Sequence, residues 1–584
     1  MIPFTMHTIK SKWSALSLFS LFLVPCVHAQ QDTVSRSVTV EREFQPIIQS
    51  AGKLNVSPKR METQEPKMEV IFSEYSATDS LSFYSKPLRF PSKPFPEQKQ
   101  SNGILDAGLG YFNSHLNFRY LVPVSGKASK GVKLNLFAHH DAEWGVCTWE
   151  ETTVGLDFVK QLSDIDVYFD VAGKNTFFTR FGRYYDGDKL SISRFSDLSE
   201  QDKQSIWTVA ANVGVRSKKT ADIQYKVQTG YQAYILPSQV AEHQINTFCN
   251  VQWNGEEHHA GVDIAVRNAF SSVEDGLWLP TDTIQTYRSR HGVRIHPYYK
   301  YTGERIRVRA GVNLDMNIGK GQMMSSNEQI SFAPSPDAFV EYRIIPSWLA
   351  VYAGAEGQLG FGTLDDYMAY CPYRAASSSV ISTHVSSYIP VDAYWGFKIR
   401  ATDNLLLDVY AHYAYMKNQT IIFADSLSIL PDGYLDYCYG DYQRWKVGVE
   451  LTYHYQDIVR LLVSGNYYHW TANGIEAPEN MPFSPKTVYD RPAWDLHVRV
   501  DAHIDSHWSL YSDNVFAGPI NMMTWKGNQK GKVFVDLSLG ARYDFKSDLG
   551  VYLQLDNFIN RHNDHFYGYQ LEGIQVMAGC CWKF

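Results

Sequence analysis

Residues 574–584 read IQVMAGCCWKF and alternate with a period of two. One face carries Ile574, Val576, Ala578, Cys580, Trp582 and Phe584, and the other carries Gln575, Met577, Gly579, Cys581 and Lys583. This period is typical of a β-strand whose two sides meet different surroundings. The sequence therefore predicts that the chain ends in a strand with one apolar face and one mixed face.

The same alternation recurs along the chain. Apolar faces such as Ile165, Val167, Phe169 and Val171 oppose ionisable faces such as Asp164, Asp166 and Asp170. Three more stretches of this kind run over residues 305–316, 494–504 and 533–542. Ionised side chains require water on one face, and an unbroken apolar face requires lipid or a core. A soluble sandwich is an alternative, but it rarely contains so many strands of this length.

Composition favours a membrane barrel over a soluble sandwich. Phe, Trp and Tyr make up 14% of the 584 residues, with 38 Tyr, and outer-membrane barrels place aromatic girdles at both membrane interfaces. No stretch carries the eighteen or so consecutive apolar residues of a transmembrane helix. The net charge of −7 argues against nucleic acid as a partner.

Three regions are expected along the chain. Residues 1–29 read as a signal peptide, with Lys10 and Lys12 before an apolar run and a small-x-small cleavage site that ends at Ala29. A lipoprotein signal at Cys26 and an ordinary helix are the weaker alternatives. Residues 30–101 are rich in proline and form an extended periplasmic or luminal segment. Residues 102–584 form the barrel and contain alternating short turns and long loops.

The turns give an estimate of the strand number. About ten tight turns and about eleven long loops predict an antiparallel barrel of about 22 strands, within a range of roughly 18–24. The expected turns lie at Ser125–Lys127, Ser163, Lys218-Lys219, Asn254-Gly255, Gly303, Pro346-Ser347, Thr402-Asp403, Gln456-Asp457, Asp505-Ser506 and Lys546–Asp548. Long loops are expected between them, for example over residues 363–383 and 417–442. The first hairpin, near Phe112, is faint.

The end of the chain resembles a known family. Residues 553–560 (LQLDNFIN), Arg561, residues 567–569 (YGY), Gly573 and the closing strand resemble the final hairpin of TonB-dependent receptors, most closely their plugless relatives in Bacteroidota. The resemblance implies an outer-membrane location after signal-peptide export, contact with lipid and a role in transport. It also implies that Trp582 and Phe584 are an insertion signal for the barrel-insertion machinery.

The resemblance leaves the state of the lumen open. Such receptors carry a globular plug of well over a hundred residues, and residues 30–101 are too few to form one. The lumen is therefore expected to be partly filled by that segment, plugged by a partner, or open. The region around Val38, Val40, Phe44 and Pro46 resembles the segment before the barrel in these proteins. It could bind a periplasmic partner by adding a strand, as a TonB box does.

Charged rows on the water-facing side are the candidate site residues. Arg305, Arg307 and Arg309 form one stripe, which would favour anionic solutes unless carboxylates on neighbouring strands neutralise it. The stronger expectation is such internal pairing. Asp495, His497, Arg499, Asp501 and His503 mix both signs and are expected to form an internal ion-pair network.

No cofactor, metal site or catalytic constellation is expected. His562, Asp564 and His565 lie in the last loop, and His139-His140-Asp141 and His258-His259 include neighbours that point to opposite faces of a strand. The seven cysteines show no paired spacing. The leading hypothesis is an outer-membrane barrel that transports or docks a solute. The alternative is a non-conducting structural or assembly component that binds periplasmic or surface proteins through its loops or N-terminal segment.

Overall fold

The computed structural model describes residues 102–584, except for gaps in the loops. The gaps are 124–130, 145–147, 180–184, 187–188, 191–202, 219–221, 237–239, 274–288, 320–331, 374–385, 425–434, 477–483 and the positions 365, 367, 369–370, 457, 485, 525 and 547. The expected signal peptide and the segment 30–101 lie outside the described residues. Within the described part of the chain, no helix has both the length and the apolar character to cross a membrane.

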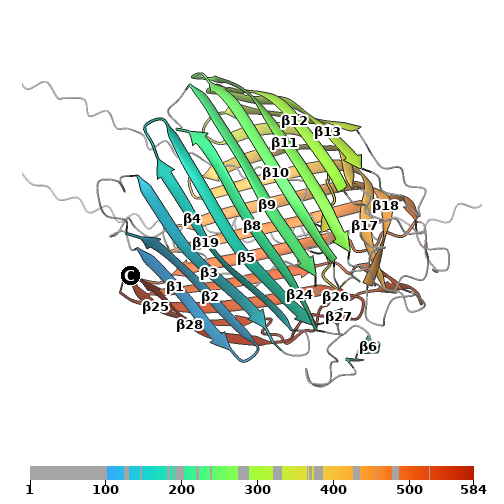
Figure 1. Cartoon of the computed structure of the whole chain (residues 1–584). Coiled ribbons are helices and arrows are strands. Elements are labelled where there is room, and N and C mark those ends of the chain that lie inside the picture. The colour runs from blue at the N-terminus through green and yellow to red at the C-terminus, as the bar shows by residue number, and fades with distance from the viewer. Residues whose placement is uncertain are drawn as a thin grey trace, which may run out of the picture. The chain divides into compact units, whose positions relative to one another are not determined.

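Twenty-two antiparallel strands pair in one closed ring, as the period-two pattern predicted. Each strand of the ring pairs with the next in chain order (Figure 1). The strands are β1 (Gly103–Gly110), β2 (Asn113–Val122), β3 (Val132–Glu143), β4 (Trp149–Gln161), β5 (Ile165–Thr179), β8 (Lys203–Ser217), β9 (Ile223–Leu236), β10 (Val240–Asn254), β11 (His258–Val273), β12 (Ser289–Thr302), β13 (Ile306–Gly319), β14 (Phe332–Ile345), β15 (Leu349–Leu359), β16 (Tyr388–Thr402), β17 (Leu405–Ala424), β18 (Leu435–Tyr455), β19 (Val459–Glu476), β20 (Trp494–His503), β21 (Trp508–Ala517), β24 (Phe534–Lys546), β25 (Leu549–Asp556) and β28 (Gln575–Lys583).

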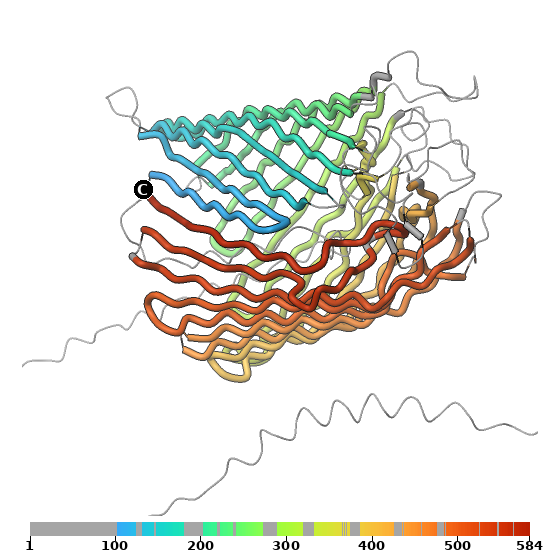
Figure 2. Tube along the Cα trace, turned by 90° about the horizontal axis from the view of Figure 1, so that it is seen from below, coloured from blue at the N-terminus to red at the C-terminus, as the bar shows by residue number. Residues whose placement is uncertain are grey.

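The terminal strand closes the ring, as Figure 2 shows where β28 runs beside β1. Residues 577–583 pair with residues 104–110. The backbone nitrogen of Gly103 donates to the carbonyl oxygen of Phe584 at 2.8 Å, and the nitrogen of Phe584 donates back at 3.0 Å. The closure leaves no sheet edge, so every backbone group in the wall has a neighbouring strand to bond, which a bilayer requires.

The outer face of the wall is apolar. Val576, Trp582 and Phe584 of the last strand segment are exposed, whereas Gln575 and Met577 are buried, so the predicted faces of this strand are correct. Exposed aromatics gather near one end at Trp253, Trp348, Tyr455, Trp508 and Phe545, and near the other end at Trp207, Phe270, Phe332, Trp445 and Tyr467. Two aromatic bands flanking an apolar belt are typical of a barrel in an outer membrane.

The two ends of the barrel differ in their connections. The turns from Ser163 to Lys546–Asp548 each join two paired neighbours at one end, which we call the turn end. The turn expected at Ser125–Lys127 lies outside the described residues. The opposite end, which we call the loop end, carries the long connections. The first connection at this end is short, because β1 ends at Gly110 and β2 begins at Asn113.

The expected loop over residues 417–442 is wrong. β17 and β18 continue to Ala424 and from Leu435, past a register shift between Met416 and Gln419. The small hairpin of β22 (Asn521–Thr524) and β23 (Gly527–Lys530) adds to this extension, since Phe423 pairs with Met523. A buried cluster that includes Ile421, Tyr442 and Tyr489 holds these layers together. Tertiary packing at the loop end therefore lengthens these strands beyond the membrane-spanning pattern.

Two further hairpins stand outside the ring. They are β6 (Tyr185–Asp186) with β7 (Lys189–Leu190), and β26 (Asp564–Phe566) with β27 (Tyr569–Gln570). Both belong to connections at the loop end.

Candidate functional site

The first part of the connection between β15 and β16 folds inward from the loop end. We call its described residues, 360–364, 366, 368 and 371–373, the inner segment. Its start is fixed by charged side chains of the wall: the guanidinium of Arg290 donates to the carbonyl oxygen of Gly362 at 2.9 Å, and that of Arg294 donates to the carbonyl oxygen of Leu359 at 3.1 Å. The backbone nitrogen of Leu359 donates to Asp315 at 3.1 Å. The Arg294–Asp315 ion pair thus holds both polar groups of one residue.

The far part of the inner segment reaches distant strands of the ring. Leu364 and Met368 are 1% and 2% exposed and pack in a buried cluster that contains Phe178, Ile206, Tyr234 and Leu236. These four residues come from β5, β8 and β9. On another side, the ring of Tyr373 stacks on that of Tyr569 with centroids 4.0 Å apart. The inner segment therefore bridges the barrel interior between strands that are far apart around the ring.

A buried carboxylate on β10 anchors the middle of the inner segment. Glu242 is 0% exposed, and its two oxygens accept the backbone N–H of Leu364 at 3.0 and 3.1 Å. Gln244 donates to the same carboxylate at 2.7 Å. The bonded N–H begins a short turn whose side-chain cap is Asp366, which accepts from the hydroxyl of Thr363 at 2.7 Å. The negative charge of Glu242 therefore lies at the N-terminal end of this turn, where free backbone N–H groups make an anion electrostatically favourable.

A cavity of about 450 Å³ lies in the loop half of the barrel, between the wall and the inner segment. Strands β11, β12, β13, β15 and β17 provide one side, and residues 360–362 and Asp366 provide the other. Its charged lining residues are Arg267, Arg294, Arg491, Asp315 and Asp366. This volume falls in the range of small-molecule sites.

The charges around this cavity do not cancel. Asp315 forms an ion pair with Arg294, with 2.6 Å between Oδ1 and Nε. Arg267 is exposed on the interior face of β11 and forms no ion pair with any described residue. Asp366 accepts a hydrogen bond from the hydroxyl of Thr363 and keeps its charge, so the lining carries three arginines against two aspartates. The lining therefore offers a guanidinium that is ready to bind an anion.

The second available cation is Arg491, in the connection before β20. It is 8% exposed, its guanidinium carbon lies 4.4 Å from the ring centre of Tyr442, and it donates to the carbonyl oxygen of Tyr489 at 3.0 Å. Among the described residues it has no carboxylate partner within ion-pair distance. Stacking on an aromatic ring orients the planar guanidinium without neutralising its charge.

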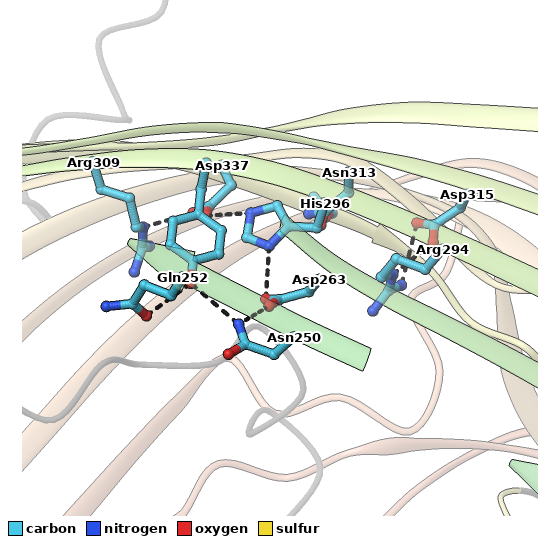
Figure 3. Close-up of polar contacts among 11 residues, drawn as sticks. Asn250, Gln252, Asp263, Arg294, His296, Arg309, Asn313, Asp315 and Asp337 are labelled. Carbon is cyan, nitrogen blue, oxygen red and sulfur yellow. Dashed lines mark hydrogen bonds and ion pairs between the residues drawn. The ribbon is translucent and has the colours of Figure 1, made fainter. Parts of the chain in front are cut away.

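The arginine stripe predicted on β13 lies mainly away from this cavity. Arg309 pairs with Asp337 at 2.8 Å and with Glu356 at 2.9 Å, and Figure 3 shows it at one end of a row of polar contacts. In that row, His296 contacts Asp337 at 2.8 Å and Asp263 at 3.3 Å. Arg305 is exposed at the turn end, and Arg307 lies half-buried between them. The carboxylates of Asp337 and Glu356 thus neutralise the charge of Arg309.

The mixed row on β20 lies within a network of polar contacts. Arg499 pairs with Asp513 at 2.9 Å and with Asp501 at 3.1 Å. His497 contacts the other oxygen of Asp513 at 2.6 Å. Asp495 accepts from Asn466 at 2.8 Å, and His503 contacts Ser509 at 3.0 Å. Val38, Val40, Phe44 and Pro46 lie outside the described residues, so the partner-binding role of that segment stays a prediction.

Sequence reasoning missed the residues that build the cavity. Arg267 and Arg294 alternate with apolar neighbours like many other interior residues, and nothing local marks them. The signal for the inner segment was its length: residues 360–387 form a long connection that contains apolar Phe361, Leu364 and Met368. Such apolar residues in a loop require a buried partner, but the pattern does not say which one.

The architecture matches known structures. The ferric-catecholate import receptor Fiu from E. coli K12 aligns with a TM-score of 0.57 and 10% identity over 83% of this chain and 82% of that chain. The copper transporter OprC aligns with a TM-score of 0.59 and 12% identity over 83% of this chain and 80% of that chain. The FrpB iron transporter from Neisseria meningitidis aligns with a TM-score of 0.62 and 9% identity over 84% of this chain and 82% of that chain. No family model and no curated protein matches the sequence.

The fold is that of the barrels in these receptors and transporters. The resemblance read from the last hairpin is thus confirmed at the level of the barrel and its 22 strands. At 8–12% identity the match concerns the fold alone. The closed wall and its apolar belt with aromatic bands are those of an outer-membrane protein, so the loop end corresponds to the cell exterior in this architecture.

Proposed function

We propose that this chain is an outer-membrane uptake protein that binds an anionic solute in the cavity between the barrel wall and the inner segment. The observation that carries the proposal is the exposed guanidinium of Arg267, which has no ion-pair partner among the described residues and lines the partly open cavity of about 450 Å³. The stacked guanidinium of Arg491 lines the same cavity. Guanidinium groups bind carboxylates, phosphates and other anions through two parallel hydrogen bonds.

The position of the cavity supports uptake from the loop side. It lies in the loop half of the barrel, so a solute entering between the loops would reach it first. The inner segment forms one side of this cavity and crosses the interior to distant strands, so its contacts with β5, β8, β9 and β10 would have to loosen for passage. Several neighbours in structure are named as iron or copper transporters or import receptors, and negatively charged metal chelates are therefore the first ligands to test.

The alternative of a closed structural or assembly component is not favoured by any observation on the described residues. The neighbours named above are transporters and receptors rather than enzymes. The absence of a plug, the origin in Bacteroidota and the use of residues 30–101 as a partner-binding segment remain part of this proposal. Their support is the resemblance of the last hairpin and the residues around Val38 and Pro46.

Fluorescence titration tests the anion site. Trp470 lies near the cavity, with its ring centre 5.7 Å from the guanidinium carbon of Arg491, so its emission should report occupancy. The detergent-purified protein would be titrated with an anionic ferric tris-catecholate and with a neutral ferric chelate of similar size. We expect the anionic chelate to bind more tightly, and Arg267→Gln to weaken it roughly tenfold.

A matched control is Arg305→Gln, which removes an exposed arginine at the turn end of the same barrel. We expect this variant to leave the affinity unchanged. Equal binding of the anionic and neutral chelates, combined with no effect of Arg267→Gln, would refute the proposed preference for anions.

A further inference from the structure

Three side chains with metal-ligating atoms converge on the interior wall near the loop end. They are His115 of β2 and His139 and Asp141 of β3. The strands pair so that His115 lies directly opposite Asp141, and His139 and Asp141 share a face because they are two residues apart. Their candidate ligand atoms all lie within 4.8 Å of one another.

Both imidazoles point at the same carboxylate. Nδ1 of His115 lies 2.5 Å from Oδ1 of Asp141, and Nε2 of His139 lies 2.5 Å from Oδ2. The two rings are 5.7 Å apart between centroids and inclined at 65°. Each side chain is 14–15% exposed, so the group is largely desolvated and still reachable from the barrel interior.

The sequence predicted no metal site here, because adjacent histidines on a strand point to opposite faces. In the structure this reason applies only to His140. His140 does point to the opposite face, where it contacts Thr152 at 2.8 Å and Ser114 at 3.3 Å. The second imidazole comes instead from His115, which lies 26 residues before Asp141. Strand register, which the sequence does not state, brings it into place.

The donor set suits a divalent first-row transition metal. Two imidazole nitrogens and one carboxylate oxygen are ligands of Zn²⁺ and Cu²⁺. Each imidazole donates an N–H to one carboxylate oxygen of Asp141. One metal ion would bind between the three side chains, and both protons would be released to water. Ligand atoms bound to one tetrahedral ion at about 2.0–2.1 Å are about 3.3 Å apart, so the rings would shift outward from their distances of 2.5 Å.

The neighbouring charges are compatible with a cation here. Glu151 of β4 lies opposite Asp141 in register, and its carboxylate pairs with Lys174 at 3.0 Å. The cation of Lys174 is therefore offset by Glu151, and Asp141 remains the anionic ligand for a dication. Three protein ligands would leave a fourth tetrahedral position for water or a solute from the barrel interior.

We propose that His115, His139 and Asp141 form a binding site for a divalent transition metal, with Zn²⁺ as the reference ion. The site stands on β2 and β3, whereas the cavity of the proposed function stands on β11 to β17. The two proposals can therefore fail separately.

Metal titration of the untagged, full-length protein in detergent tests the site. Zn²⁺ binding is followed by calorimetry, and Co²⁺ binding by visible absorption, whose intensity reports coordination number. We expect one high-affinity ion per chain, with X-ray absorption showing two imidazoles in the first shell. His139→Gln and His115→Gln, on different strands, should each weaken binding roughly 100-fold or more.

The matched control is His140→Gln, which removes an adjacent histidine from the opposite face and should leave the affinity unchanged. Heat-modifiable electrophoretic mobility checks that each variant forms the barrel. The proposal is overturned if the folded protein binds no stoichiometric ion, or if His140→Gln weakens binding as much as His139→Gln does.

Discussion

Replacing Glu242 by Gln should release the inner segment from the barrel wall. The carboxylate is fully buried and accepts the backbone N–H of Leu364 with both oxygens, at 3.0 and 3.1 Å. Gln244 donates to it at 2.7 Å. The amide retains one acceptor oxygen, loses the charge and turns an NH₂ group toward donors. Since hydrogen bonds to charged groups contribute about 1.5–3 kcal/mol, we expect the attachment to weaken by about 2 kcal/mol.

A loss of about 2 kcal/mol raises the population of the detached segment by roughly 30-fold, because each 1.4 kcal/mol is a factor of ten. Hydrogen exchange measured by mass spectrometry reads this population directly. The amides of the inner segment should lose about the same factor in protection. The exchange of peptides from the turn ends of β15 and β16 should not change.

Glu341→Gln is the matched control for Glu242→Gln. Glu341 is also a buried interior carboxylate, at 1% exposure, but its nearest cations are Lys398 and Arg343 on the wall. This variant should leave the exchange of the inner segment unchanged. If Glu242→Gln exchanges like the native protein in this segment, or if Glu341→Gln loosens it equally, the anchoring role assigned to Glu242 is refuted.

Three further predictions concern packing, closure and pH. Leu364→Ala should destabilise the inner segment by about 2–5 kcal/mol and speed up its hydrogen exchange. Leu549→Ala, on the exposed outer face, should leave that exchange unchanged, and equal exchange in both variants would contradict the prediction. Phe584→Ala should lower the yield of heat-resistant barrel in a membrane-insertion assay, since this residue closes the ring and its ring packs 4.8 Å from that of Trp582; an unchanged yield would contradict it. Burial raises the pKa of Asp490 to about 7, against the opposing hydrogen bond from Ile422, so the folded state holds a proton that the unfolded state has lost, and stability at this connection should fall as pH rises from about 4 to about 7. Asp490→Asn should remove that dependence, and a pH profile identical to that of the native protein would show that another group is responsible.

Much of the wall was readable from local pattern. The alternation in residues 165–171 and 494–504 assigned the apolar and polar faces, and the structure has Phe169 exposed and Asp166, Asp495 and Asp501 buried. Turns such as Asn254-Gly255 and Asp505-Ser506 lie between neighbouring strands of the ring. These features depend on a residue and its neighbours within a few positions, and the period of two carries that information.

The extension of β17 and β18 was beyond local pattern. The sequence prediction placed a loop over residues 417–442, where the structure has Asn418 at a φ of 54° and a register shift between Met416 and Gln419. The strands resume because Ile421 and Phe423 are buried against Cys438, Tyr489 and Met523. A partner more than sixty residues away thus decides the local backbone.

The amino-acid sequence by itself determined that this chain forms a closed antiparallel barrel with lipid on one face of each strand, because side-chain alternation is a property of neighbouring residues. Only the tertiary structure decided what occupies the interior. Glu242 and Leu364 are 122 positions apart, and Arg267 and Arg491 are 224 positions apart. His115 meets Asp141 only through strand register. The anchored inner segment, the cavity and the histidine–aspartate group arise from ring closure and register, which bring distant residues together and leave no periodic trace in the sequence.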